Sequence, residues 1–278
     1  MTTIDEITNK IFCGDARTVL KSFPSESIDM CITSPAYFHQ RSYNLGDAEI
    51  GAEKDVNAYL NNLRLVFDQV KRVLKPRGTC WVNIGDAYKN GELFLIPHDF
   101  VLEMQANDWK TFNEIIWHVP NVYTSSSMRR FTKDFEYLFA FAKQDDYYFE
   151  QQYEPYKTKY KSFEYTGKGK KDYKSEGAQD PSDAKRSMLK SMSHGIGRHV
   201  RCVWSITHKS SKHTATFPRE LVRRPILAGC PFGGIVLDPF AGSGVALRVA
   251  KESGRDYVGI DFNPKSVEMA LESVNAAC

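Results

Sequence analysis

The spacing of hydrophobic and polar residues in the first half of the chain predicts alternating strands and helices. Residues 27–32 alternate between apolar and polar, which predicts a strand that runs into the Pro-containing loop 33–35. Apolar residues recur at helical spacing from Val56 to Leu74, and Pro76 with Gly78 ends the pattern, so an amphipathic helix is expected there. Further strands are predicted at 79–84, 112–118 and 135–142. A strand, a helix and a strand in succession begin an α/β fold.

The C-terminal part of the chain shows a βαβα pattern. The predicted elements are a strand at 234–238, a helix at 245–252, a strand at 257–261 and a helix at 265–274 that Asn263-Pro264 opens. This arrangement is typical of a doubly wound sheet. Residues 151–199, in contrast, are rich in Lys, Tyr, Gly and Ser with little periodicity, which indicates an insertion rather than a layer of the core.

Composition places the chain among soluble globular proteins. It has 278 residues, of which 42% are hydrophobic and 26% charged, enough for one large domain with a sizeable core. No apolar run approaches the roughly 18 residues needed to cross a bilayer, and the N-terminus lacks the features of a signal peptide, so a cytoplasmic protein without membrane association is expected. The six cysteines are scattered singly, which predicts neither a disulfide scaffold nor a metal site.

Charge is distributed unevenly along the chain. Between residues 151 and 212 there are 14 Lys and Arg against 6 Asp and Glu, a surplus of +8, whereas the remainder carries −5. Tyrosines are interleaved with these lysines, and such a composition is typical of a surface that neutralises phosphates and lies near nucleic-acid bases. A solvated basic flap is the alternative interpretation.

A glycine-containing turn stands between the strand at 234–238 and the following helix, and it reads Asp238-Pro239-Phe240-Ala241-Gly242-Ser243-Gly244. Glycines let a ligand approach the backbone, and a helix N-terminus offers unpaired N–H groups. Asp261 closes the next strand, where a carboxylate can accept both hydroxyls of a ribose. Leu247 stands where a dinucleotide fingerprint has its third glycine, which favours a nucleoside-containing cofactor without a pyrophosphate. The alternative is a tight turn with a structural role only, in which Asp238 is merely a turn residue.

The segment Thr33-Ser34-Pro35-Ala36-Tyr37 resembles the catalytic tetrapeptide of the DNA amino-methyltransferases. Members of that family pair it with an Asp-Pro-Phe-x-Gly-x-Gly cofactor loop like the one at 238–244. Because the tetrapeptide precedes the loop and a basic stretch separates them, the order resembles the permuted β-class. Ala36 replaces the second proline of the usual pattern, which removes one fixed φ angle. Without the cofactor loop, the same residues would be interpreted as a strand-ending turn with a buried tyrosine.

Three other segments resemble the family: 13–16 the segment near the cofactor adenine, 83–86 the second core strand, and 213–218 the segment before the cofactor loop. The resemblance implies a Rossmann-like S-adenosylmethionine-dependent methyltransferase fold, an α/β fold with a mostly parallel, circularly permuted sheet. It also implies a catalytic part at 1–150, an inserted basic target-recognition region at 151–200 and a cofactor-binding part at 201–278. His213 is not expected to be catalytic, since amine methylation requires neither a metal nor a histidine base.

The resemblance implies S-adenosylmethionine as the cofactor and assigns roles to individual residues. The residues expected at the cofactor are Asp15, Ala16, Thr33, Phe217, Pro218, Asp238, Pro239, Phe240, Ala241, Gly242, Ser243, Gly244, Asp261 and Phe262. The residues expected to bind DNA are Lys157, Lys159, Lys161, Lys168, Lys170, Lys171 and Arg198. Two alternatives stay open here: Asp15 can serve as a helix N-cap, and Phe217-Pro218 can be core packing.

The catalytic residues expected from the motif are Ser34, Pro35 and Tyr37. The lone pair of an exocyclic amine is delocalised into the ring, so acceptors aimed at both amino hydrogens are needed, and the Ser34 hydroxyl and the Pro35 carbonyl supply them. Tyr37 is expected to stack on a base flipped out of the duplex. No catalytic cysteine is expected, because the chain has no Pro-Cys dipeptide.

The Ser form of the tetrapeptide resembles the members that methylate cytosine N4, so cytosine N4 in double-stranded DNA is the expected target. Adenine N6 is the first alternative. An RNA, protein-amide or small-molecule amine methyltransferase and an inactive module that binds DNA and cofactor are the others. A homodimer and a cognate restriction endonuclease are partners compatible with the resemblance.

Overall fold

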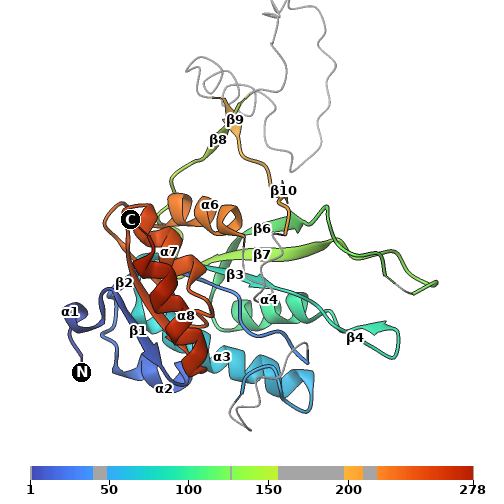
Figure 1. Cartoon of the computed structure of the whole chain (residues 1–278), viewed down its shortest axis with the longest axis horizontal. Coiled ribbons are helices and arrows are strands. Elements are labelled where there is room, and N and C mark those ends of the chain that lie inside the picture. Colours follow the sequence, from blue (N-terminus) through green and yellow to red (C-terminus); the bar gives the residue numbers. More distant parts are fainter. Residues whose placement is uncertain (1, 40–48, 126, 156–196, 209–217, 278) are drawn as a thin grey trace, which may run out of the picture. The chain divides into compact units, whose positions relative to one another are not determined.

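A mostly parallel sheet is the framework on which the functional residues stand (Figure 1). The computed structural model describes residues 2–39, 49–125, 127–155, 197–208 and 218–277. The chain divides into two units, the first comprising Met1–Glu150 with Cys202–Cys278 and the second Gln151–Arg201. Within the described residues, the first unit contains an eight-stranded sheet of order β1-β12-β11-β2-β3-β7-β6-β10. The α/β fold with a mostly parallel sheet that was expected from the sequence is thereby confirmed.

The strands of this sheet are β1 (Lys10–Cys13), β2 (Ile28–Thr33), β3 (Leu74–Ile84), β6 (Lys110–His118), β7 (Phe135–Ala142), β10 (Val203–Ser205), β11 (Ile235–Asp238) and β12 (Asp256–Asp261). The helices are α1 (Ile4–Ile7), α2 (Ala16–Val19), a 3₁₀ turn η1 (Leu20–Ser22), α3 (Val56–Val73), α4 (Ile96–Ala106), α6 (Arg219–Gly229), α7 (Val245–Glu252) and α8 (Pro264–Asn275). A small hairpin of β4 (Tyr88–Lys89) and β5 (Glu92–Leu93) follows β3.

The order of strands reverses between β11 and β2. From β11 the chain proceeds through α7 to β12, which lies on one side of β11, whereas from β2 it proceeds through α3 to β3 on the other side. Among the described strands of this sheet, only β7 runs antiparallel to both of its neighbours. In doubly wound folds, ligands bind beyond the carboxyl ends of the strands at such a reversal. Thr33 ends β2 and Asp238 ends β11, so both residues stand at this point.

Helix α3 shows how the apolar pattern produces the core. Asp55 caps its N-terminus by accepting a hydrogen bond from the Ala58 amide. The apolar stripe then buries Tyr59, Leu63 and Phe67 against the sheet. The right-handed crossovers β2-α3-β3 and β11-α7-β12 proceed in opposite directions, which places α3 and α7 on opposite faces of the sheet.

The structure differs from the sequence expectation at the end of α3. The helix ends at Val73 and β3 begins at once with Leu74, so that the strand includes Pro76 and Gly78, which were expected to separate the two elements. Pairing with β2 shifts register between Ile28 and Met30, which accommodates the irregular start of β3. The elements β1, β10, α4 and α6 were not predicted from their hydrophobic pattern.

The described residues of the second unit form one pair of short strands. β8 (Tyr153–Glu154) pairs antiparallel with β9 (Arg198–His199). In the described part of the chain, no helix is both long and apolar enough to span a membrane.

Candidate active site

The ends of β2 and β11 are joined by a buried hydrogen bond. The Thr33 hydroxyl donates to Asp238 Oδ1 at 2.6 Å, and the Phe240 amide donates to the same oxygen at 3.1 Å. Thr33 and Asp238 are both buried. Burial raises the pKa of Asp238 to about 7, although these two hydrogen bonds act in the opposite direction. The loop at 238–244 is thus fixed directly to the segment that carries Ser34.

Two glycines of the loop are required by its backbone. Gly242 has φ +51° and Gly244 has φ +74°, a region that residues with a Cβ seldom adopt. Gly244 also lies against α8, since a Cβ at this position would be 2.8 Å from the Cα of Ala270. At Gly242 the nearest atom to an added Cβ would be the Phe240 carbonyl oxygen at 3.9 Å, so space remains open beside the loop. The loop and the N-terminus of α7 therefore form a cradle that fits a nucleoside cofactor.

Asp261 stands beside this cradle at the end of β12. Its Oδ2 accepts a hydrogen bond from the Gly242 amide and its Oδ1 one from the Asn263 amide, each at 2.8 Å. Burial raises the pKa of Asp261, and hydrogen bonds from these amides and from the Ser266 side chain oppose that shift. A carboxylate has about four acceptor positions, so Asp261 holds the loop and can still accept a ribose hydroxyl. Phe262 follows and is 36% exposed.

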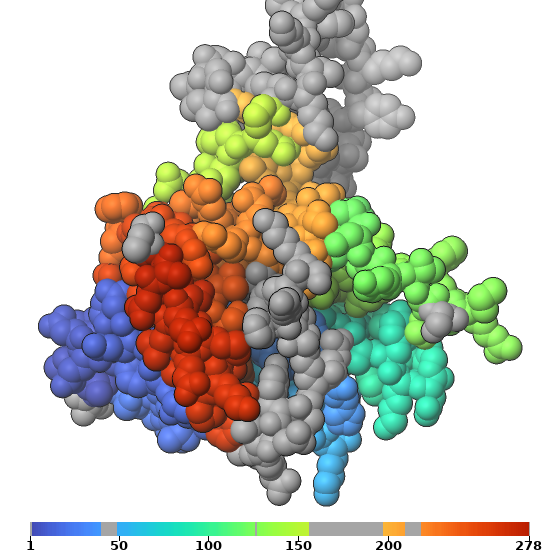
Figure 2. Space-filling model, viewed as in Figure 1, coloured from blue at the N-terminus to red at the C-terminus, as the bar shows by residue number. Residues whose placement is uncertain are grey.

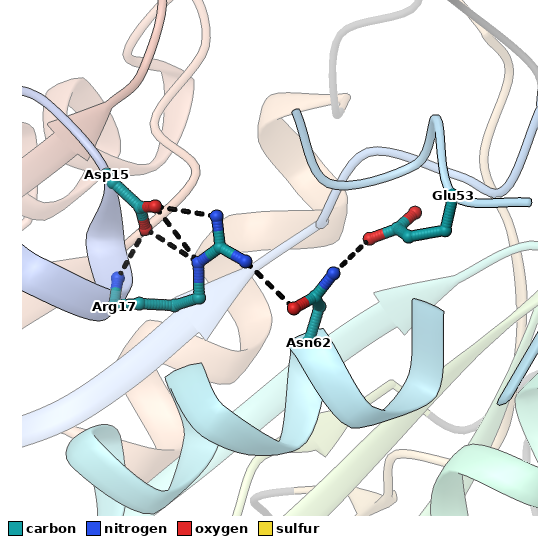
Figure 3. Close-up of polar contacts among 4 residues, drawn as sticks. All are labelled: Asp15, Arg17, Glu53 and Asn62. Carbon is teal, nitrogen blue, oxygen red and sulfur yellow. Dashed lines mark hydrogen bonds and ion pairs between the residues drawn. The ribbon is translucent and has the colours of Figure 1, made fainter. Parts of the chain in front are cut away.

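Asp15 belongs to a chain of polar contacts that Figure 3 displays. The carboxylate caps α2 through the Arg17 amide at 2.8 Å, so the N-cap alternative is present, and it also pairs with the Arg17 guanidinium at 2.6 Å. That guanidinium donates to Asn62 on α3, and Asn62 donates to Glu53, each at 2.8 Å. β1 pairs with β12 so that Cys13 is opposite Asp261, which brings the segment 13–16 to the same edge of the sheet.

The tetrapeptide lies beside the end of β3 and the start of β7. Tyr37 Oη lies 2.6 Å from Glu136 Oε2 and 3.0 Å from Asn83 Oδ1. The Ser34 hydroxyl lies 3.4 Å from Tyr37 Oη and 3.5 Å from Asn83 Oδ1, and both contacts are long for an O–H···O hydrogen bond. Burial and the neighbouring Glu136 raise the pKa of Tyr37 well above its ordinary value, so its hydroxyl keeps its proton.

The hydrogen bonds of Asn83 and Tyr37 leave acceptor oxygens facing the Ser34 hydroxyl. The Asn83 amide nitrogen donates to the Tyr137 carbonyl at 2.9 Å and to Glu136 at 3.1 Å, which turns Oδ1 toward Ser34 and Tyr37. The Tyr37 hydroxyl has one proton, and it donates this proton in the short hydrogen bond to the Glu136 carboxylate. Tyr37 Oη and Asn83 Oδ1 are then the two acceptors that the Ser34 hydroxyl faces, at 3.4 and 3.5 Å. Ser34 Oγ then presents lone pairs, rather than a proton, to a substrate.

The substitution of the second proline by Ala36 is compensated by contacts from α3 and a neighbouring loop. The Tyr59 hydroxyl donates to the Ala36 carbonyl at 2.9 Å. Gly51 lies so close that a Cβ there would be 3.2 Å from the Tyr37 carbonyl oxygen. On the other side, a Cβ at Gly85 would be 2.4 Å from the Tyr37 ring. The tetrapeptide is thus held in place without a second fixed φ angle.

Pro218 and Arg198 are two more of the predicted residues within the described part of the chain. Pro218 is the N-cap of α6. Arg198 pairs with Glu154 across β8 and β9 at 2.8 Å. Phe217 and the six lysines expected to bind DNA lie outside the described residues.

Sequence reasoning overlooked the two residues that organise the tetrapeptide, Glu136 and Tyr59. One signal was present for Glu136: it is a carboxylate within the apolar strand Phe135–Ala142, and a charge in such a strand needs a partner. For Tyr59 no comparable signal exists, because an aromatic residue on the apolar stripe of a helix is ordinary core.

The raised pKa of Asp238 predicts a pH-dependent stability. The folded-state pKa of about 7 lies above the ordinary value of 3.8. At pH values between these two, the Asp238 carboxyl is therefore protonated to a greater extent in the folded protein than in the unfolded chain. The contribution of Asp238 to the free energy of unfolding therefore falls as pH rises from about 4 to about 7, by at most about 4 kcal/mol. Urea unfolding of the wild type and of Asp238→Asn across this range should give diverging curves, with the wild type losing more stability. Parallel curves would contradict the assignment.

The fold and the site together define a doubly wound, cofactor-dependent transferase site that lies at the strand-order reversal. Comparison with known proteins specifies the class. A family model described as DNA methylase matches residues 28–272. The Type II methyltransferase M.Cfr9I of Citrobacter freundii is 32% identical over 292 residues, which cover 94% of this chain and 86% of that protein. M.SmaI of Serratia marcescens is also 32% identical, covering 95% and 90%.

Solved structures show the same fold. A putative DNA modification methylase from Thermus thermophilus, complexed with S-adenosyl-L-methionine, matches with a TM-score of 0.65 and 26% identity, covering 97% of this chain and 94% of that one. The cytosine-N4-specific PvuII DNA methyltransferase matches with a TM-score of 0.68 at 18% identity, covering 96% and 86%.

The chain belongs to the DNA methylase family whose members modify N6 or N4 amines. It is therefore a DNA methyltransferase, and its cofactor is S-adenosylmethionine. The resemblance found in the sequence motifs is confirmed.

Proposed function

We propose that this enzyme methylates the exocyclic N4 amine of cytosine in duplex DNA, on a base flipped out of the helix. The observation that carries the proposal is the Ser34 hydroxyl, which follows the buried Thr33–Asp238 contact and faces Tyr37 Oη and Asn83 Oδ1. A neutral hydroxyl at this position resembles the members of the family that act on cytosine N4. Flipping is required because a target amine inside a duplex is out of reach of residues recessed at a sheet edge.

Ser34 and Pro35 act on the amine by accepting hydrogen bonds from its two N–H groups. With the Ser34 proton turned toward Tyr37 Oη and Asn83 Oδ1, Oγ directs a lone pair to one amino hydrogen, and the Pro35 carbonyl accepts a hydrogen bond from the other. These contacts favour a tetrahedral nitrogen whose own lone pair is free to attack. S-Adenosylmethionine, when bound, supplies a methyl group on a positively charged sulfur. The methyl group would pass to the amine nitrogen as its bond to sulfur breaks, and the displaced amino proton would go to solvent.

Glu136 is a positioning residue in this scheme. It accepts hydrogen bonds from the Tyr37 hydroxyl at 2.6 Å and from the Asn83 amide at 3.1 Å, so it fixes the donor and acceptor pattern around Ser34 without touching the base. The Tyr37 ring lies against Gly85, and we assign to it stacking on the flipped base.

The cofactor would be held by the cradle at 238–244 and by neighbouring residues at the same edge. We assign the ribose hydroxyls to Asp261, and the adenine to Phe262 with the segment of Asp15 and Ala16. Thr33 holds Asp238, which shapes the loop from below. Residues 201–278 are accordingly the cofactor-binding part and 1–150 the catalytic part.

We further propose that 151–200 recognises the target sequence, as its charge predicts. The relatives named Type II methyltransferases support a place in a restriction-modification system, with a cognate endonuclease as partner. A homodimer is compatible with the family, and the molar mass in solution tests it.

The decisive experiment is incubation with mixed-sequence duplex DNA and methyl-labelled S-adenosylmethionine, followed by digestion to nucleosides and mass spectrometry. Labelled N4-methylcytosine is the expected product. Labelled N6-methyladenine would show that the target base is adenine, with the same mechanism of methyl transfer. Label in RNA but not in DNA, or cofactor and DNA binding with no label at all, would overturn the proposal.

A further inference from the structure

The loop that joins β6 to β7 exposes three large apolar side chains. This loop, residues 119–125 and 127–134, is called the prong below. Tyr123 is 99% exposed, Met128 97% and Phe131 98%. The prong extends away from the strands that carry it (Figure 1), and Figure 2 shows it protruding from the surface in green. Large apolar side chains gathered on a projection mark an interaction site, because water is a poor environment for them.

The charge of the prong indicates the chemistry of the partner. Arg129, Arg130 and Lys133 stand against the single acidic residue Asp134. The Arg130 guanidinium lies 4.0 Å from the centre of the Tyr88 ring, which orients it beside the β4–β5 hairpin. Exposed apolar and aromatic side chains on either side of two arginines suit nucleic acid, since the bases offer stacking faces and the phosphates offer negative charge. A second copy of the prong is a poorer partner, because its own positive charges would repel those of the first.

The prong begins and ends at the active site. β6 ends at His118 and β7 begins at Phe135, and these residues pair at the edge of the sheet where β3 also ends. Glu136, two residues after the prong, contacts both Tyr37 and Asn83. A duplex that delivers a base to Ser34 must therefore pass close to the prong.

We propose that the prong enters duplex DNA beside the flipped base. Met128 and Phe131 occupy the base stack where the target base has left it, and Arg129 and Arg130 bind the flanking phosphates. Extrusion of a base costs unstacking energy, and an inserted apolar side chain offsets part of that cost. The inference rests on the proposed function, and it adds a DNA contact outside the region 151–200.

Two double variants and one control test the prong. The first is Met128→Ser with Phe131→Ser, the second is Arg129→Ala with Arg130→Ala, and the control is Leu102→Ser, which removes a 62% exposed side chain from α4. Fluorescence anisotropy measures affinity for a mixed-sequence duplex, and label incorporation measures methylation of the duplex and of its separated strands.

For the serine double variant, the affinity for duplex DNA and the rate of its methylation are expected to fall at least tenfold. On separated strands, where no stacked base has to be displaced, the methylation rate is expected to fall less than threefold. The alanine double variant is expected to reduce the slope of log affinity against log salt by about two, close to one for each phosphate that is no longer neutralised. Cofactor affinity and the behaviour of the Leu102→Ser control should match the wild type.

The two proposals fail in different ways. A wild type that binds duplex DNA through the prong without methylating it would refute the proposed function and leave the prong intact. Variants that equal the control on duplex DNA would refute the prong, as would a wild type that does not bind duplex DNA. A change of molar mass in the serine double variant, with unchanged DNA affinity, would identify a self-association surface instead.

Discussion

Replacing Ser34 by alanine is expected to lower the rate of methyl transfer by about 10²–10³-fold, the effect typical of removing one preorganised polar group from a reacting centre. The Ser34→Ala enzyme keeps the Thr33–Asp238 hydrogen bond and the loop at 238–244, so its affinity for S-adenosylmethionine should be unchanged. Single-turnover label transfer measures the rate, and calorimetry measures cofactor affinity.

Tyr37→Phe is the matched control for this prediction. It removes a hydroxyl from the same cluster but keeps the ring against Gly85, and Asn83 stays oriented by the Tyr137 carbonyl and Glu136. A loss of less than about tenfold is expected, since the Ser34 hydroxyl still finds Asn83 Oδ1. Unchanged turnover in Ser34→Ala, or a larger loss in Tyr37→Phe than in Ser34→Ala, would refute the role of Ser34.

The parts of the fold that could be predicted are those whose signal is local. The apolar stripe on α3 and the glycine turn before α7 are each recognisable from a few neighbouring residues, and both were predicted. The start of β3 was misplaced because Pro76 and Gly78 are strong local break signals, whereas pairing with β2 and a register shift override them. The propensities of residues 74–78 do not reflect the pairing with β2, because β2 is distant in sequence.

The active site shows the same division. The residues from 33 to 37 and from 238 to 244 were identified because each set forms a contiguous motif. Glu136 reaches Tyr37 across 99 positions of sequence, and only the antiparallel pairing of β7 with β3 makes them neighbours. Leu247 stands where a dinucleotide fingerprint has its third glycine. Its side chain packs against Gly259 of β12, where a Cβ would be 2.5 Å from it, and this contact is likewise not visible in the local sequence.

Gly244→Ala should produce the largest loss of stability among substitutions in the cofactor loop, and with it a loss of cofactor binding. An added methyl group would meet the Cα and Cβ of Ala270 at 2.8 Å, so α7 would be pushed from α8, and the residue would also keep a φ of +74° that disfavours alanine. The two effects together are expected to lower the free energy of unfolding by about 2–4 kcal/mol. Urea unfolding measures this loss, and calorimetry measures the cofactor affinity.

Gly233→Ala separates the two causes, because Gly233 has nearly the same φ, +72°, and no atom within 4 Å of an added Cβ. It is expected to lose only about 1 kcal/mol, the cost of the backbone conformation alone. The difference between the two variants then measures the contact with Ala270, which holds the N-terminus of α7 in place beside the ribose-binding carboxylate proposed at Asp261. Equal losses in both variants would show that the approach of α7 to α8 contributes nothing, and that the glycine serves only the turn.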